Sequence, residues 1–118
     1  MKEKRTEMRL CEGPFEQIES GEKTVEVRLY DLKRRKIRVG SYVRFIHAED
    51  AARQISARVV ALHLFPSFAE LFSSKQFGKC GFNGASIEEA VKRMYTFYTP
   101  EEEERWGVVG IELKLSSD

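Results

Sequence analysis

Three charged residues in one short segment have types and spacing that could do chemistry. Lys23, Glu26 and Arg28 stand in the segment GEKTVEVR, which covers residues 21–28. Residues 24–30 alternate between polar and apolar side chains, which predicts a half-buried strand. Glu26 and Arg28 would share its polar face about 7 Å apart, where long side chains can touch. Lys23 precedes the strand, so alternation does not fix its direction, but it could swing beside Glu26.

This cluster is compatible with two kinds of chemistry and with a plainer role. Lys23 and Arg28 could bind a phosphate or carboxylate while Glu26 orients them. A desolvated Lys23 could instead lose its proton near neutral pH and act as a base, with Glu26 as its partner. The three residues could also be surface charges that pair weakly in solvent. Tyr30 shares the polar face and is a further candidate for ligand contact.

A basic stretch follows this strand. Between Arg28 and Arg44 the chain has seven basic residues and one acidic residue, although its overall net charge is only +1. Such a local excess attracts phosphate groups, and the flanking Tyr30 and Tyr42 could stack on bases. An ordinary solvated loop is the alternative. The predicted nucleic-acid contacts, called the basic segment below, are Lys33, Arg34, Arg35, Lys36, Arg38 and Arg44.

The elements that must position these residues are short strands and helices. Alternation and β-branched residues predict strands at 6–10, 24–30, 42–47, 54–65 and 108–115. A short helix is predicted at 15–20, and three more follow Ser67, Ser86 and Thr99, each of which has a glutamate three residues later. This order predicts an α+β fold: a small, mostly antiparallel β-barrel with about five strands and three to four short peripheral helices.

Length and composition narrow the remaining possibilities. The chain has 118 residues, of which 42% are hydrophobic and 33% charged, as expected of one globular domain over residues 1–118. The cysteines form no CxxC pair and the two histidines lie far apart, so we expect no metal site and no cofactor. Without an apolar signal segment or a stretch long enough to span a bilayer, the chain is expected to be cytoplasmic and free of membrane contact.

The other polar and aromatic residues fit structural roles. Cys11 and Cys80 are expected to be small, buried free thiols, and His47 and His63 to be structural. The acidic run 101–104 is typical of a helix N-terminus, with a protein contact as the alternative. Most aromatic residues are expected in the core. The aromatic residues that could line a cleft are Phe77, Phe82, Tyr95 and Tyr98.

Several of these segments resemble the ASCH domain family. Its hallmark is G-x-K-x-x-E-x-R followed by a G-D or G-S turn and an apolar strand, which matches residues 21–28 and then Gly40-Ser41 with residues 42–45. Residues 68–72 and 98–113 also resemble bacterial ASCH proteins, so the resemblance covers nearly the whole chain. It implies a PUA-like β-barrel with a cleft between the first helix and the barrel wall.

The resemblance also implies functions. ASCH domains are proposed to bind RNA, and relatives occur in transcription coactivators. One branch hydrolyses the acetyl amide of N4-acetylcytidine with a lysine, a threonine nucleophile and a glutamate, and another is described as a ribonuclease. Lys23 matches the lysine of the first branch, but the position of its nucleophile holds Glu26, and Thr24 is not at the matching place.

We therefore predict that the chain binds RNA or a nucleotide-like ligand. Lys23 and Arg28 would contact phosphate or base, Glu26 would orient them, and the basic segment would attract the ligand. The alternative is a small hydrolase of modified nucleosides or RNA, with Lys23 and Glu26 as catalytic residues and Thr24 as a less favoured nucleophile. A non-catalytic adaptor that contacts proteins through the acidic helix is a third hypothesis.

Overall fold

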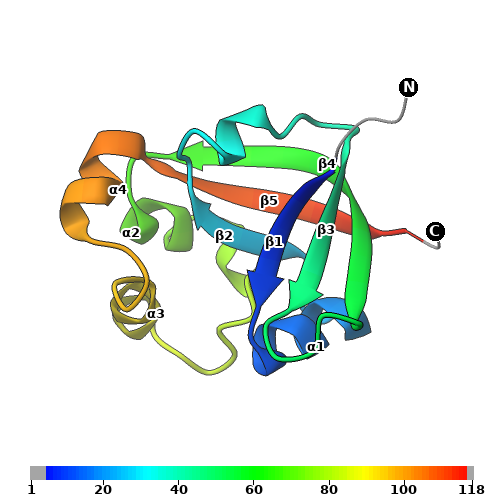
Figure 1. Cartoon of the computed structure of the whole chain (residues 1–118). Helices are drawn as coiled ribbons and strands as arrows, with labels where there is room; N and C mark the ends of the chain where they lie inside the picture. The colour runs from blue at the N-terminus through cyan, green and yellow to red at the C-terminus, as the bar shows by residue number, and fades with distance from the viewer. Residues whose placement is uncertain (1–4, 117–118) are drawn as a thin grey trace.

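Five strands form one mixed sheet in the computed structural model, which describes residues 5–116. The strands are β1 (Thr6–Leu10), β2 (Val25–Leu29), β3 (Tyr42–His47), β4 (Gln54–Phe65) and β5 (Val108–Leu115). Their order in the sheet is β1-β3-β4-β5-β2, and Figure 1 shows the sheet curled into a half-barrel. β1 runs parallel to β3, and the other three pairings are antiparallel. The predicted α+β fold, a mostly antiparallel PUA-like barrel, is confirmed.

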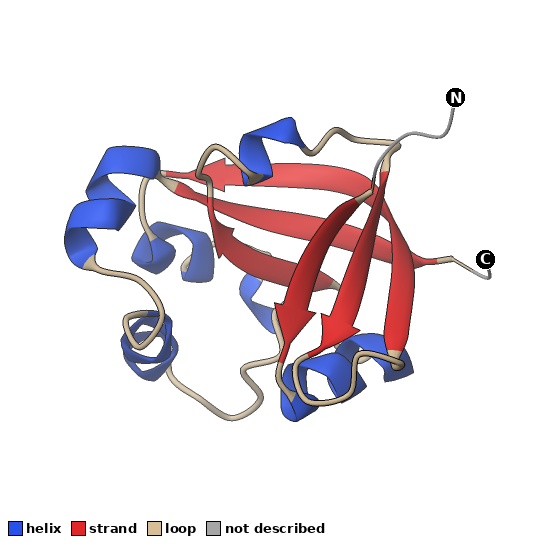
Figure 2. Cartoon of the chain, in the orientation of Figure 1, coloured by secondary structure: helices blue, strands red, loops and turns tan. Residues whose placement is uncertain are grey.

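Four short helices surround this sheet. They are α1 (Glu12–Ser20), α2 (Phe68–Phe72), α3 (Ile87–Met94) and α4 (Pro100–Trp106), with 3-10 turns η1 (Arg34–Lys36) and η2 (Phe77–Lys79). Figure 2 shows α1 under the ends of β1 and β3, while α2, α3 and α4 gather at the other side of the molecule. None of the helices within residues 5–116 is long and apolar enough to cross a membrane.

The helix starts follow from the capping residues in the sequence. Ser86 with Glu89 and Thr99 with Glu102 form complete capping boxes, and the Ser67 side chain accepts a backbone N–H in the first turn of α2. The predicted helix 15–20 is too short, because α1 already begins at Glu12 and has proline in its first turn. Proline fits there since the first backbone N–H groups of a helix have no partner within it.

The core lies on both faces of β2, so the prediction of a half-buried strand is wrong. On one face, Val25, Val27 and Leu29 pack with residues of α2 and α3. On the other face, Glu26 pairs in register with Ile111 and is only 4% exposed. The buried α1 residues Phe15 and Ile18 pack in the same cluster as Ile111. The polar face of β2 is therefore turned into the molecule.

Candidate functional site

The junction between α1 and β2 places Lys23 beside Glu26. Gly21 ends α1 in the left-handed conformation (φ 85°), as expected of a helix C-cap. The backbone N–H of Lys23 then donates to the carbonyl of Gln17 at 2.9 Å, which folds the chain back before β2 begins. Glu26 and Arg28 project from one face of β2 because successive strand residues alternate in direction. Three side chains from this short segment thus meet.

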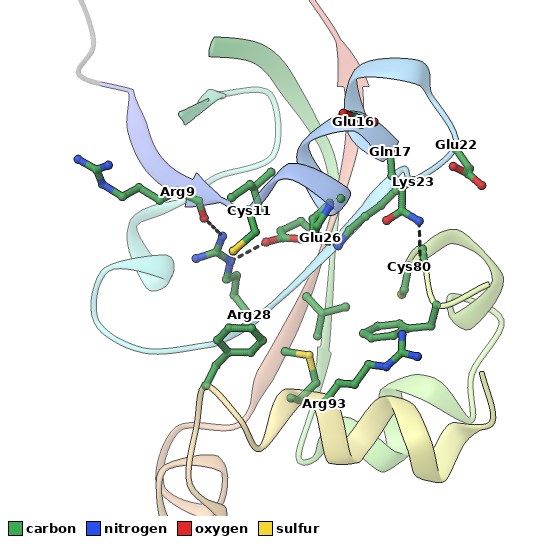
Figure 3. A pocket seen from close by; sticks show the side chains of 18 of the residues that line it. Arg9, Cys11, Glu16, Gln17, Glu22, Lys23, Glu26, Arg28, Cys80 and Arg93 are labelled. Atoms are coloured by element: carbon green, nitrogen blue, oxygen red, sulfur yellow. Dashed lines mark hydrogen bonds and ion pairs between the residues drawn. The ribbon is translucent and has the colours of Figure 1, made fainter. Parts of the chain in front are cut away.

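Lys23, Glu26 and Arg28 form one ion-paired cluster, called the pocket triad below. Lys23 Nζ lies 2.8 Å from Glu26 Oε1, and Arg28 Nε lies 2.6 Å from Glu26 Oε2. Arg28 Nη2 also donates to the backbone carbonyl of Arg9 at 2.9 Å, which connects β2 to the end of β1 (Figure 3). The side chains of the triad are 8%, 5% and 14% exposed, in sequence order. The three charges therefore converge and do not spread into solvent.

The triad carries more positive than negative charge in a place with little water. Burial alone would raise the pKa of Glu26, but Lys23 and Arg28 outweigh it and lower this pKa to about 2. Burial also disfavours the Arg28 cation, but Glu26 and the Tyr98 hydroxyl together raise its pKa. Two cations thus share one carboxylate. An anion would balance the remaining charge.

A pocket of about 890 Å³ opens beside the triad (Figure 3). It lies between α1, the end of β1, β2 and α3, and its volume falls in the range of small-molecule sites. Phe82, Met94, Phe97 and Tyr98 contribute apolar and aromatic surface to it, while Arg9 and Arg93 add two further cations. The pocket therefore combines a charged wall with an aromatic wall.

Residues 80–83 close one side of the pocket and are attached to α1 and the residues that follow it. Gln17 Nε2 donates to the carbonyl of Gly81 at 3.1 Å, and Asn83 Nδ2 donates to Glu22 Oε1 at 2.5 Å. Gly81 has a positive φ of 83°, and a Cβ there would lie 2.7 Å from Gln17 Oε1 and 3.0 Å from Lys23 Cδ. Only glycine lets this backbone approach Lys23 so closely.

The comparisons with known proteins agree with the sequence motif. The model of the ASCH domain family matches residues 3–117. The chain belongs to the ASCH family. This family is linked to RNA binding. A search of curated proteins found no match.

Solved structures share the ASCH fold over nearly the whole chain. The crystal structure of hypothetical protein PH0355 has 34% identity and a TM-score of 0.82, covering 96% of this chain and 100% of that one. Protein PF0455 from Pyrococcus furiosus has 31% identity and a TM-score of 0.75, covering 98% and 100%. An ASCH protein from Zymomonas mobilis, 19% identical, has a TM-score of 0.57 and covers 94% and 68%. The last likeness concerns the fold alone.

The basic segment of this ASCH chain lies outside the pocket, because none of its six residues is among those that line it in the described structure. Arg34 pairs with Asp31 at 3.0 Å, and Arg44 lies 3.6 Å from Glu7. The Arg35 guanidinium stacks 4.4 Å from the centre of the Tyr30 ring and donates to the carbonyl of Trp106. Three of the six cations thus have local partners.

The other three cations of the basic segment, Lys33, Lys36 and Arg38, are exposed. Lys33 lies within electrostatic reach of the triad: desolvation, with the positive charges of Arg34 and Arg28, lowers its pKa.

Neither Tyr30 nor Thr24 lines the pocket beside the triad. Tyr30 packs under Arg35 and lines a second, smaller hollow with Trp106, so it does not face the pocket. Thr24 precedes β2, and its backbone N–H donates to the carbonyl of Lys79. Its side chain does not line the pocket. Tyr42, also expected beside RNA, lies under the Arg5 guanidinium at 5.1 Å.

The cysteines behave differently from each other. Cys80 is buried as predicted, and burial raises the pKa of its thiol to about 12, so it is neutral. The prediction of a buried Cys11 is wrong: it precedes α1, is exposed and lines the pocket. Within residues 5–116, no three His, Cys, Asp or Glu side chains gather closely enough to hold a metal ion.

The histidines and the acidic helix make structural contacts. His47 Nδ1 accepts backbone N–H groups of the β3–β4 turn, and His63 lies 2.8 Å from Glu112. In α4, Glu103 is buried and accepts from the Phe68 N–H at 2.7 Å and from the Tyr95 hydroxyl at 2.5 Å. At least one member of the acidic run is thus turned inward to hold α2.

Sequence reasoning missed several pocket residues. Arg9, Gln17, Arg93 and Phe97 come from four separate places in the chain, and only the fold brings them to the pocket. One usable signal is the spacing of glycines at 78, 81 and 84, because glycine lets a backbone approach its neighbours closely. Of the four aromatic residues considered for a cleft, Phe82 and Tyr98 line the pocket, whereas Phe77 and Tyr95 do not.

Proposed function

We propose that this ASCH domain binds a nucleotide of single-stranded RNA, or a nucleotide-like ligand, in the pocket beside α1. The observation that carries the proposal is the pocket triad: Lys23 and Arg28 share the single carboxylate of Glu26, at 2.8 and 2.6 Å, and all three side chains are largely buried at the wall of the pocket. The family's link to RNA supports the class of ligand.

The triad has hydrogen-bond donors left for a ligand. An ammonium group has three N–H donors and a guanidinium has five. Glu26 takes one from Lys23 and the Nε–H of Arg28, and the Arg9 carbonyl takes one from Nη2. The remaining donors suit oxygen atoms, such as those of a phosphate or of a base carbonyl.

The aromatic wall suits a base or a sugar. Phe82 and Tyr98 offer ring faces and edges within the pocket, and Met94 adds a flexible apolar surface. Every nucleobase has a flat π-face, so stacking on aromatic side chains is a general way to hold single strands. The pocket has cationic hydrogen-bond donors on one side and aromatic rings on the other. These two sides match the phosphate and the base of a nucleotide.

The geometry favours binding over the hydrolase alternative. With a pKa of about 2, Glu26 stays a carboxylate at neutral pH and is poorly matched to proton transfer. Lys23 Nζ is held by Glu26 Oε1 at 2.8 Å as one half of a buried ion pair. The less favoured nucleophile Thr24 does not line the pocket.

The proposal is tested by measuring the affinity for a fluorescein-labelled single-stranded RNA with wild type, Arg28→Gln and Arg58→Gln. Arg58 lies on β4, is exposed and does not line the pocket, so its variant is the control. Loss of a charged hydrogen-bond donor costs about 1.5–3 kcal/mol, or roughly 10- to 150-fold in affinity. Arg28→Gln should show this loss and Arg58→Gln should not.

Two results would reject the proposed function. Equal affinities of Arg28→Gln and wild type, with Arg28→Gln still folded by circular dichroism, would remove the pocket from RNA binding. Turnover of acylated nucleosides or of the RNA, abolished by Lys23→Ala and followed by chromatography, would favour the hydrolase instead.

A further inference from the structure

Phe97 lines the pocket, yet its aromatic side chain is largely exposed to solvent, and the ion pairs of the triad give no reason for this exposure. Its side chain is 70% exposed. Of the large apolar side chains that are exposed within residues 5–116, it alone also lines the pocket. A phenyl ring left in water at the edge of a binding pocket points to a contact made with the ligand.

The turn that carries Phe97 is held firmly by hydrogen bonds. The backbone N–H groups of Phe97 and Tyr98 both donate to the carbonyl of Met94, at 3.0 and 3.1 Å. The hydroxyl and the N–H of Thr96 both donate to the carbonyl of Arg93. On the inner side, Tyr98 stacks on the buried ring of Phe68 with a centroid distance of 5.9 Å. The exposure of Phe97 is thus built into an ordered turn.

A cation accompanies this ring at the pocket edge. Arg93, four residues before Phe97 at the end of α3, also lines the pocket. Its guanidinium lies 5.9 Å from the centre of the Phe82 ring, which also lines the pocket. Arg93 and Phe97 thus bring a cation and an exposed ring to the same pocket.

We propose that the site binds two consecutive nucleotides: one base in the pocket, the linking phosphate beside Arg93, and the next base stacked on Phe97. This inference rests on the proposed function and specifies its ligand as a segment of a nucleic-acid chain, with the exposed ring of Phe97 as the contact for the second base. Stacking on one phenyl ring reads no base edge, so the second position should accept all four bases with similar affinity.

The experiment compares ligands that differ by one nucleoside. Calorimetry would measure binding of the four ribonucleoside 3′- and 5′-monophosphates, and then of the dinucleoside monophosphates that extend the best of them. In wild type, the second nucleoside should strengthen binding about 5- to 140-fold, the range that base–aromatic stacking gives. Phe97→Ala should remove most of this gain, measured as the ratio of the dinucleotide affinity to the mononucleotide affinity of the same variant.

Two variants control this comparison. Phe97→Tyr keeps an aromatic face and should restore the gain. Leu64→Ala removes another exposed apolar side chain, 54% exposed on β4 and outside the pocket, and should leave the gain unchanged.

The results separate the two proposals. A gain that is absent in wild type, or that survives in Phe97→Ala, would overturn the two-nucleotide site while leaving the proposed function in place. Failure of wild type to bind any mononucleotide or dinucleotide would overturn the proposed function itself, and the inference with it.

Discussion

The pocket triad and the basic segment are both rich in positive charge, but their cations are stabilised differently: by a buried carboxylate in the triad and largely by solvent in the basic segment. Lys23 and Arg28 are fixed by one buried carboxylate and remain 8% and 14% exposed. In the basic segment, Arg44 pairs with Glu7 at the surface, where the two side chains are 37% and 53% exposed. A buried cation must have its partners in place before any ligand arrives, whereas an exposed cation is already stabilised by water. Local charge density in a sequence therefore does not distinguish cations fixed by a buried partner from cations held in water.

The largest expected effect comes from removing the carboxylate that holds the triad. Glu26→Gln leaves two buried cations without their anion, and breaking a buried pair in this way costs about 3–5 kcal/mol. Urea unfolding should show this loss. In the surface counterpart, Glu7→Gln removes the partner of Arg44, at 3.6 Å, where both side chains are substantially exposed. This change should cost less than about 1 kcal/mol.

Similar losses of unfolding free energy in Glu26→Gln and Glu7→Gln would contradict the difference proposed between the two regions. Such a result would mean that water reaches the triad as freely as it reaches the surface pair.

The pH dependence of stability gives a second test of how strongly the triad stabilises the Glu26 carboxylate. The pKa of Glu26 is about 2 in the folded chain against an ordinary value of 4.5. A lowered pKa stabilises the fold fully above the ordinary value, and this stability is lost as the pH falls from about 4.5 toward 2. The difference amounts to roughly 3 kcal/mol. The unfolding free energy of wild type minus that of Glu26→Gln should therefore decline over this interval and stay constant between about pH 5 and 8.

A difference between wild type and Glu26→Gln that stays constant as the pH falls through this interval would contradict the ion-paired triad. It would show that the ionised form of Glu26 is no more stable in the folded chain than in the unfolded chain, so that its pKa is the same in both.

Two glycines with positive φ allow a matched test of the two regions. Gly81 faces Gln17 and Lys23, whereas Gly40, next to the basic segment, has φ 92° and open space where a Cβ would stand, with no other atom within 4 Å. Alanine at either position should cost about 1–2 kcal/mol for the left-handed conformation. Gly81→Ala should also displace Lys23 and weaken RNA binding, which Gly40→Ala should leave intact. Thermal unfolding and RNA titration of both variants would measure this, and equal RNA affinities would show that Gly81 does not support the site.

The triad and much of the fold could be predicted from the sequence because they depend on local patterns. Alternation put Glu26 and Arg28 on one strand face, and capping residues set the starts of α2, α3 and α4. The prediction that β2 is half-buried was wrong because the helices that pack on its apolar face are distant in sequence and its polar face turns into the core. Arg93 and Phe97 were missed for a similar reason: no local signal connects α3 and its following turn to a pocket beside α1.

The smallest effect is expected from the exposed cations of the basic segment. Lys33, Lys36 and Arg38 are the appropriate targets, because Arg34, Arg35 and Arg44 also hold local structure. If all three exposed cations contact phosphates, changing them to glutamine should make the slope of log affinity against log salt shallower by about 2. The affinity itself should fall less than it does in Arg28→Gln, and RNA titrations at several salt concentrations would measure both quantities.

The salt titration also shows whether the pocket or the basic segment contributes more to RNA affinity. An unchanged slope would remove the basic segment from the RNA interface and leave the pocket alone. A loss of affinity larger than that of Arg28→Gln would reverse the comparison, because phosphate contacts at the surface would then contribute more binding free energy than Arg28 does in the pocket. The pocket would then hold one nucleotide of a strand that the surface had already bound.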